Sequence, residues 1–412
     1  MRRWSWLVAV AAAALAERGL QARGALLYPD GYQYLLMAKG IAAHGRPIVT
    51  LGHGGDTWLP SADASLKPLF PALVALLHLT GLQLELAARV LTAVAGASVC
   101  TVSAALARRL TGSTAAGLGA AALCLASPAL SEWSAYSGPD PLAQALALGA
   151  ALSLCARRPA LAGVLGGLCV ATRPEYALLA LPLCLLRPRF GVAALASLAV
   201  VVAAVRPPLA FHAAAGLPGG AGGIGTLLGS DWPLLVLAGL GLASAPRRAA
   251  VYAGGAIGAL AVAYAAKNSG SARYFAQLLP ACAVLAAWAI ARRRIYAVGA
   301  LAAAALLVAA PRVVPARSDV FHELAPALRS GGPLVTAAPD AYGVLLSRPV
   351  RFLRPGARGL IVLDAAQRAY QPHIEYRGTI VSSLADRRGF VRPDGSLDER
   401  GALLVRGTIE PG

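Results

Sequence analysis

Residues 84–109, LELAARVLTAVAGASVCTVSAALARR, combine a long apolar run with an arginine doublet at its end. A helix needs about 20 mainly apolar residues to cross the hydrocarbon core of a bilayer, and this run meets that length. Basic residues that flank such a run favour the cytoplasmic side. The stretch therefore predicts a transmembrane helix whose C-terminal end faces the cytoplasm.

Apolar runs closed by clustered arginines recur along most of the 412-residue chain. The further clusters lie at 157–158, 187–189, 247–248 and 292–294, and two helices fit between successive clusters. If every cluster is cytoplasmic, the N-terminus lies inside and the C-terminal segment outside. Eleven spans are then expected, near residues 4–26, 84–106, 113–127, 140–156, 160–173, 176–187, 190–206, 232–246, 249–266, 274–291 and 295–310.

The composition supports an integral membrane protein. Hydrophobic residues make up 57% of the chain and charged residues 14%, with a mean hydropathy of +0.62, which lies outside the range of soluble domains. The net charge of +18 does not indicate a nucleic-acid partner, because the basic residues fall as doublets between apolar runs. The six cysteines lie inside these runs without metal-ligand spacing, so we expect buried core residues.

Two segments allow more than one interpretation. Residues 2–16 form either a cleaved signal peptide or the start of a retained first span, and the downstream charge pattern favours the retained span. Residues 160–186 form either one long span or a hairpin of two short helices broken at 172–175. A single span would place three arginine clusters outside, so the hairpin is favoured.

The composition changes after Pro311 to a mixed soluble type. We therefore expect a transmembrane domain over 1–310, with a large first outer loop over about 17–82. Residues 311–412 are predicted to form a small extracytoplasmic α/β domain. Its expected strands are the short runs Pro333–Ala337, Val350–Leu353, Leu360–Leu363, Thr379–Ser383 and Ala402–Ile409.

With this topology, all nine acidic residues before residue 311 fall on the outer side. Either the outer loops are longer and collect polar residues, or they form a polar site; both interpretations stay open. Each candidate also has a purely structural interpretation when it is taken alone. Asp30 fits a PDG turn and Asp140 a helix N-cap. Arg173 and Arg273 fit arginines that snorkel to the interface, and Tyr34 fits an interfacial aromatic residue. Charged groups at a membrane edge are costly and thus functional candidates. The candidates are Asp30, Tyr34, Lys67, Asp140, Arg173, Glu175, Arg273 and Tyr274.

A site that combines carboxylates with arginine and lysine side chains suits a reaction between a phosphate-containing substrate and a hydroxyl group. Arginine and lysine bind phosphate, while a carboxylate takes a proton from a hydroxyl. The chain contains no Walker-type loop, GxGxxG, HExxH or GxSxG motif. The functional prediction therefore depends on the polar residues of the outer face.

An ordered set of segments resembles the membrane-embedded GT-C glycosyltransferases, the superfamily of the protein O-mannosyltransferases and the aminoarabinose transferases of lipid A. The resemblance covers nearly the whole chain, including the final α/β domain. It is carried by YPDGYQYLLMAKGIAAHG (28–45), KPLFPALVALLHLTG (67–81), AARVLTAVAG (87–96), ARRLTG (107–112), SGPDPLAQALAL (137–148), LGGLCVATRPEYALLALPL (165–183) and SARYFAQLLPACAVL (271–285).

The resemblance implies an enzyme of the cell membrane that transfers a sugar, with inversion, from a polyprenyl-phosphate donor to the hydroxyl of a lipid, glycan or protein acceptor at the outer face. Asp30 matches the first-loop catalytic acid. Lys67, Arg173 and Arg273 match basic residues near the lipid phosphate. Gly31 replaces the second acid often found there, so use of a divalent metal stays open. Two alternatives remain, a flippase or transporter for a polyprenyl-linked solute and a polymerase or ligase of lipid-linked glycans.

Overall fold

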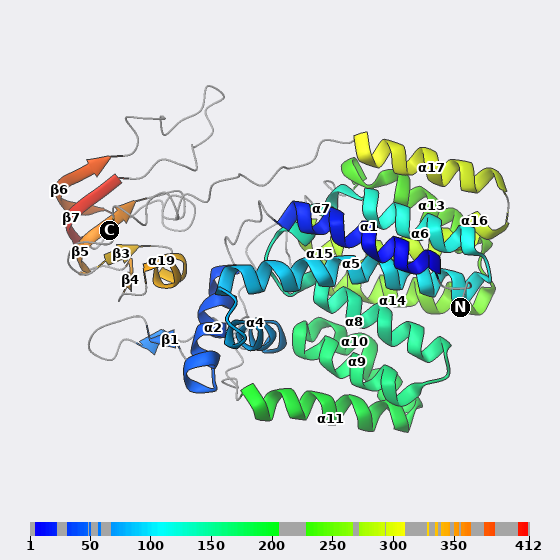
Figure 1. Ribbon diagram of the computed structural model, residues 1–412, viewed down its shortest axis with the longest axis horizontal. Coiled ribbons are helices and arrows are strands. Elements are labelled where there is room, and N and C mark those ends of the chain that lie inside the picture. Colours follow the sequence, from blue (N-terminus) through cyan, green and yellow to red (C-terminus); the bar gives the residue numbers. More distant parts are fainter. Residues whose placement is uncertain are drawn as a thin grey trace. The chain divides into compact units, whose positions relative to one another are not determined.

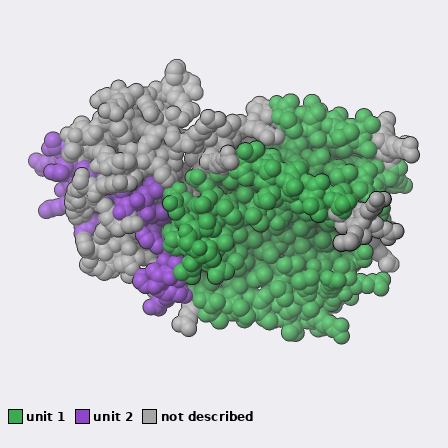
Figure 2. All heavy atoms as spheres, in the orientation of Figure 1, with its two compact units in different colours: residues 1–26, 61–315 green, residues 27–60, 316–412 purple. Residues whose placement is uncertain are grey.

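The computed structural model describes residues 5–22, 31–47, 49–50, 57–58, 67–205, 228–266, 272–292, 294–309, 328, 334–336, 339–346, 350–353, 356–363, 375–383 and 403–410. The chain divides into two compact units (Figure 2). Unit 1 holds residues 1–26 and 61–315, and unit 2 holds residues 27–60 and 316–412. Residues 27–60, which sequence reasoning counted with the first domain, thus group with the C-terminal part; the predicted boundaries stay a prediction.

The regular elements of unit 1 are all helices within its described residues (Figure 1), and each of the eleven predicted spans overlaps at least one of them. Its elements are α1 (Ser5–Ala22), α4 (Leu69–Leu79), α5 (Leu84–Thr111), α6 (Thr114–Ala126), α7 (Pro128–Ala135), α8 (Asp140–Cys155), α9 (Pro159–Thr172), the short 3₁₀ helix η1 (Pro174–Tyr176), α10 (Ala177–Leu186), α11 (Pro188–Val205), α13 (Trp232–Ser244), α14 (Arg247–Ala266), α15 (Ala272–Ala276), α16 (Leu279–Arg292) and α17 (Arg294–Ala309).

Within the described ranges, two helices are long and apolar enough to cross a membrane by themselves, α5 and α11. A third span results if α6 and α7 count together, although they are bent by 65° at Ser127. Most of the other apolar helices are only 10–17 residues long. The helices are therefore where the sequence predicts them, and their number as membrane spans stays a prediction.

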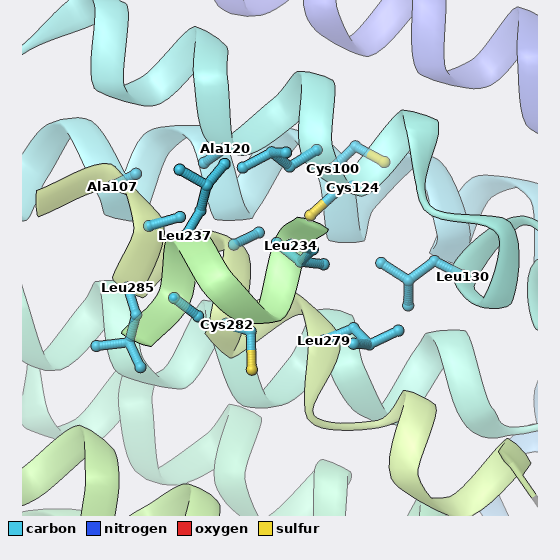
Figure 3. Close-up of a cluster of buried hydrophobic side chains, with 14 of the residues drawn as sticks. Cys100, Ala107, Ala120, Cys124, Leu130, Leu234, Leu237, Leu279, Cys282 and Leu285 are labelled. Carbon is cyan, nitrogen blue, oxygen red and sulfur yellow. The ribbon is translucent and has the colours of Figure 1, made fainter. Parts of the chain in front are cut away.

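The core of unit 1 is built from small and medium apolar side chains of α5, α6, α13 and α16 (Figure 3). Gly241 of α13 lies so close to α16 that a Cβ atom there would come within 2.0 Å of the Leu285 carbonyl oxygen. Four of the six cysteines are buried and two are half-buried, all of them as free thiols. Small residues thus let the helices approach closely.

Helices α9 and α11 pack backbone against backbone through two glycines. A Cβ atom on Gly163 would lie 2.2 Å from the Phe190 carbonyl oxygen, and one on Gly167 would lie 2.2 Å from that of Ala194. Both pairs advance by four residues in the same direction, so α9 and α11 run parallel. The chain must therefore turn after Thr172 and run back through α10 before α11 begins. This confirms the predicted hairpin of two short helices.

Unit 2 contains α2 (Gly31–His44), the two-stranded ribbon β1 (Val49–Thr50) and β2 (Thr57–Trp58), and a five-stranded mixed sheet. The sheet order is β4-β3-β5-β7-β6, parallel between β4, β3 and β5 and antiparallel beyond β5. Helix α19 (Pro339–Leu346) packs against α2. The five strands confirm the expected runs; they are β3 (Leu334–Thr336), β4 (Val350–Phe352), β5 (Arg358–Leu363), β6 (Tyr376–Ser383) and β7 (Leu403–Ile409).

The α9–α11 contact yields a stability test. Gly167→Ala places a methyl group against the backbone of α11, and we expect a destabilisation of about 2 kcal/mol from overpacking. The matched control is Gly239→Ala in α13, where a Cβ atom meets nothing within 4 Å. This control should be neutral or slightly stabilising, because alanine favours helix over glycine. Thermal unfolding of both variants in detergent checks the difference, and equal unfolding temperatures would contradict the close contact.

Candidate active site

Three separate segments of unit 1 bring charged side chains together. Asp140 is the first residue of α8, Arg173 follows the last residue of α9, and Arg273 lies in α15. Prolines at 139 and 141 suit this start of α8, because proline is preorganised for the first helical turn. Pro139, and not Asp140, occupies the N-cap position. The N-cap interpretation of Asp140 is therefore wrong.

Asp140 is the common partner of both arginines. Its Oδ1 accepts hydrogen bonds from Nε and Nη2 of Arg173, the first at 2.6 Å, and its Oδ2 accepts one from Nε of Arg273. Arg173 also donates through Nη1 to Glu175 Oε1 at 3.2 Å. Asp140 is 3% exposed and Arg173 1%. Both carboxylate oxygens of Asp140 are thus engaged by guanidinium groups away from water.

An aromatic ring faces each guanidinium. The Arg173 Cζ atom lies 5.2 Å from the ring centroid of Tyr274, and the Arg273 Cζ atom lies 5.8 Å from the Trp133 ring. Tyr264 contacts Tyr274 in a tilted arrangement, with 5.7 Å between the ring centroids and 45° between the ring planes. Such cation–π contacts strengthen when they are shielded from water. Each arginine is therefore held between a carboxylate and a ring, and this fixes its direction.

Further polar groups continue from this cluster. Tyr176 Oη donates to Gln277 Oε1 at 3.3 Å, and Gln144 Nε2 donates to the Ala276 carbonyl oxygen at 3.2 Å. Several buried polar atoms near this cluster have no hydrogen-bond partner among the described residues, among them Trp133 Nε1, Ser137 Oγ, Tyr264 Oη and Gln277 Nε2. Unpaired buried donors are costly, and clusters of them are typical of sites that take a ligand or water.

The other three predicted residues belong to other segments of the chain. Lys67 is buried, 4% exposed, immediately before α4 in unit 1. Tyr34 is buried in α2 of unit 2. Asp30 lies outside the described residues. The structure thus brings together Asp140, Arg173, Glu175, Arg273 and Tyr274, and the roles of all eight residues stay predictions.

Sequence reasoning missed the polar residues one helical turn beyond the charged ones. Gln144 follows Asp140 by four positions, Gln277 follows Arg273 by four, and Tyr176 follows Arg173 by three. Residues at this spacing lie on the same side of a helix, as Asp140 and Gln144 do in α8, and the other two pairs are joined by a single turn of chain. Polar residues repeated at three or four positions inside an apolar run were therefore the available signal.

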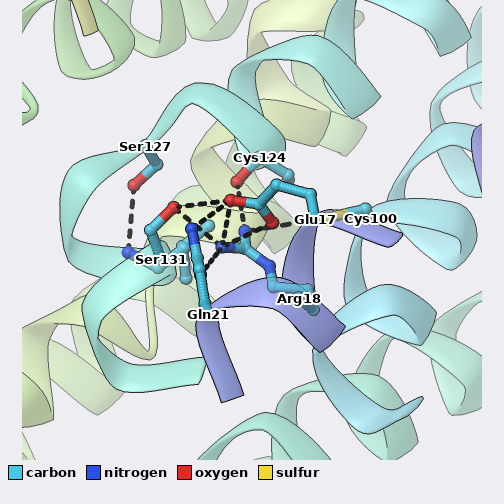
Figure 4. Close-up of polar contacts among 8 residues, drawn as sticks. Glu17, Arg18, Gln21, Cys100, Cys124, Ser127 and Ser131 are labelled. Carbon is cyan, nitrogen blue, oxygen red and sulfur yellow. Dashed lines mark hydrogen bonds and ion pairs between the residues drawn. The ribbon is translucent and has the colours of Figure 1, made fainter. Parts of the chain in front are cut away.

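A second buried network holds α7, the helix that carries Trp133 (Figure 4). Arg18 of α1 is 1% exposed and donates through Nη1 to Ser131 Oγ at 2.8 Å and through Nη2 to the Cys124 carbonyl oxygen at 2.9 Å. It also pairs with Glu17 Oε2 at 3.2 Å. Arg18 thereby ties α1 to α6 and α7.

The N-terminus of α7 has its own anchor. Asp231 accepts hydrogen bonds from Ser127 Oγ at 2.5 Å and from the Ala129 backbone N–H at 3.4 Å. Burial raises the pKa of the Asp231 carboxyl, and the hydrogen bonds from Ser127, Ser230 and Ala129 oppose this shift. A carboxylate at a helix N-terminus also interacts favourably with the helix dipole. Trp133 is therefore presented to Arg273 by a helix fixed at its start and along one face.

The fold matches that of solved structures of two other proteins. The chain matches a crystal structure of ArnT from Cupriavidus metallidurans in the apo state, with a TM-score of 0.65 and 15% identity over 98% of both chains. ArnT from the same organism bound to undecaprenyl phosphate matches with a TM-score of 0.64 and 16% identity over 98% of both chains. This likeness confirms the predicted GT-C resemblance at the level of the fold.

A second solved structure supports the same class of fold. The arabinofuranosyltransferase AftD from Mycobacteria matches with a TM-score of 0.57 and 16% identity, over 98% of this chain and 40% of AftD. No protein-family model and no curated protein matches the chain. The shared fold thus rests on three-dimensional arrangement and not on close sequence identity.

The Arg18 network generates a stability prediction. Arg18→Met should destabilise the protein by about 3 kcal/mol, because it leaves Glu17 without its buried counter-charge. Arg89→Met is the matched control, since Arg89 pairs with Glu85 at 3.8 Å in a partly exposed i,i+4 pair worth about 0.5 kcal/mol. Thermal unfolding in detergent measures both. Equal losses for the two variants would show that the Arg18 network does not hold α7.

Proposed function

We propose that this protein is a membrane glycosyltransferase that moves a sugar from a polyprenyl-phosphate donor to an acceptor hydroxyl at the outer membrane face, with inversion. The observation that carries the proposal is the pair of arginines that hold the buried Asp140, found in a fold shared with ArnT. ArnT has been solved with undecaprenyl phosphate bound. In the proposed orientation the N-terminus is cytoplasmic and the C-terminal α/β part is extracytoplasmic.

Arg173 and Arg273 are proposed to bind the phosphate of the lipid donor. Guanidinium groups present planar, bidentate donors that suit phosphate oxygens. Because Asp140 and the aromatic rings fix these groups beforehand, they can stabilise the charge that develops on the leaving phosphate without reorganising. Lys67 is proposed to contribute a further positive charge, and Tyr274 and Glu175 orient Arg173.

Asp140 is proposed as a positioning residue and not as the base. Both of its oxygens accept hydrogen bonds from arginine, so neither is available to take a proton from an acceptor. With both oxygens already bound by arginines, Asp140 is also poorly suited to bind a metal ion. Among the described residues no group of three or more His, Cys, Asp or Glu is arranged to hold a metal ion. No step of the mechanism is therefore assigned to a metal.

Asp30 is proposed as the catalytic base of a single displacement. Its carboxylate takes the proton of the acceptor hydroxyl while the hydroxyl oxygen bonds to the anomeric carbon. The bond from that carbon to the phosphate oxygen breaks, and lipid phosphate leaves with the bonding electrons. A carboxyl group with an ordinary pKa is already ionised at neutral pH, so this role needs no special tuning.

The first functional prediction concerns Asp30. Asp30→Asn should lower transfer by about 10²–10⁴-fold, because the acceptor hydroxyl loses its base. The measurement is release of free lipid phosphate from a labelled polyprenyl-phosphate sugar by purified protein. Glu85→Gln is the control, since Glu85 pairs with Arg89 of its own helix, is not one of the candidate site residues and should retain activity. Substantial activity of Asp30→Asn would contradict the assignment of Asp30 as the base. If the wild-type protein moves the donor across the membrane without releasing phosphate, a transporter would be favoured instead.

A second functional prediction separates positioning from proton transfer at Asp140. Asp140→Asn keeps the size of the side chain but removes the negative charge shared by two arginines. We expect the KM for the donor to rise and kcat to fall, together lowering kcat/KM by about tenfold or more, because the arginines both bind the phosphate and stabilise its developing charge. The pH profile of kcat should keep its shape. Loss of the acidic limb of that profile would instead make Asp140 the base.

A further inference from the structure

Three exposed arginines come together at one end of the helices of unit 1. Arg109 lies near the end of α5, and Arg157 and Arg158 lie in the turn between α8 and α9. Helices α5 and α8 are in contact (Figure 1), and Arg109 Nη2 donates a hydrogen bond to the Cys155 carbonyl oxygen at 3.4 Å. Because this bond joins the end of α5 to the end of α8, the three arginines form one group, called the basic cluster below.

The basic cluster has no carboxylate partner among the described residues. The sequence contains no acidic residue between Glu85 and Glu132 or between Asp140 and Glu175. None of the ion pairs formed by the described residues involves an arginine of the cluster. Asp140 begins α8, whose 16 residues span about 24 Å at 1.5 Å rise per residue. The cluster is therefore separate from the candidate active site, and its positive charge is open to an anion.

Arg157 also has an unusual backbone conformation. Its φ is 58°, and no other residue except glycine has a positive φ in the described part of the chain. Arg157 follows the end of α8, where the Arg157 and Arg158 backbone N–H groups donate to the Leu154 and Ser153 carbonyl oxygens. Glycine is the usual residue at such a position, because a side chain is strained there. An arginine in this strained conformation indicates a role for its side chain beyond ending the helix.

Exposed aliphatic side chains adjoin the basic cluster. Leu161 and Val164 of α9 are exposed, three and six residues after Arg158, and the exposed Leu110 directly follows Arg109. In a bilayer such aliphatic side chains contact acyl chains, while arginines extend to the level of the headgroups. A water-soluble acidic partner would pair with the cations and find no use for the aliphatic surface. The surface therefore suits an amphiphile with an anionic head.

We propose that the basic cluster binds the phosphodiester headgroup of an anionic phospholipid, whose acyl chains lie along the exposed side of α9. Guanidinium groups present planar, bidentate donors to phosphate oxygens. Basic groups between membrane helices bind anionic headgroups by the same chemistry. In the proposed orientation this phospholipid belongs to the cytoplasmic leaflet. The inference goes beyond the proposed function and does not depend on sugar transfer.

Lipid binding to the full-length protein in detergent tests the site, with native mass spectrometry as the readout. The probes are phosphatidylglycerol and phosphatidylcholine with the same acyl chains, and we expect tighter binding of phosphatidylglycerol. Arg157→Gln with Arg158→Gln should lower this preference by about tenfold or more, because each basic residue near an anionic headgroup contributes about fivefold. The control, Arg187→Gln with Arg189→Gln, removes the same charge from the exposed turn between α10 and α11 and should keep most of the preference. Equal losses in the two double variants, or no preference in the wild type, would overturn the inference.

A glycine variant separates lipid binding from folding. Since glycine adopts a positive φ without strain, Arg157→Gly should unfold at the same or a higher temperature than the wild type in detergent alone. Added phosphatidylglycerol should raise the unfolding temperature of the wild type by more than that of Arg157→Gly. An equal rise in both proteins would show that the Arg157 side chain does not hold the lipid. Equal protection of the wild type by water-soluble glycerol 1-phosphate would contradict a phospholipid as the ligand.

Discussion

The arrangement of the candidate site depends on one carboxylate shared by two arginines. Asp140 can stay ionised inside unit 1 because both of its oxygens accept hydrogen bonds from guanidinium groups. The arginines in turn rest on the rings of Tyr274 and Trp133. Since the three charged residues come from the start of α8, the end of α9 and α15, this interaction fixes how three separate segments meet.

The surrounding helices make that meeting possible. Gly163 and Gly167 allow α9 and α11 to run parallel in close contact, so the chain has to break after Thr172 and return through α10. This break presents Arg173 outside the regular helix and within reach of Asp140. Arg18 and Asp231 hold α7 and thereby place Trp133 against Arg273. The close packing at the glycines and the contacts of the buried charged residues therefore both help to position the side chains of the candidate site.

Much of the fold could be predicted from local patterns. Apolar runs and arginine clusters located the helices, and the turn residues at 172–175 located the hairpin. Partner choice was not predictable, because the arginines that bind Asp140 lie 33 and 133 residues away from it. Arg18 was missed because an arginine at the end of an apolar run resembles an interfacial residue, although it is buried. Gln277 was missed because a single amide in an apolar run carries no charge to reveal it.

The central claim, that the fixed arginines serve a displacement at the anomeric carbon of a lipid-linked sugar, is tested most directly by the stereochemistry of the product. Purified protein is incubated with a polyprenyl-phosphate sugar of known anomeric configuration and an acceptor, and the product is analysed by NMR. The account predicts a glycoside of opposite configuration and one lipid phosphate released per transfer. Retained configuration, or no transfer from any such donor, would contradict it.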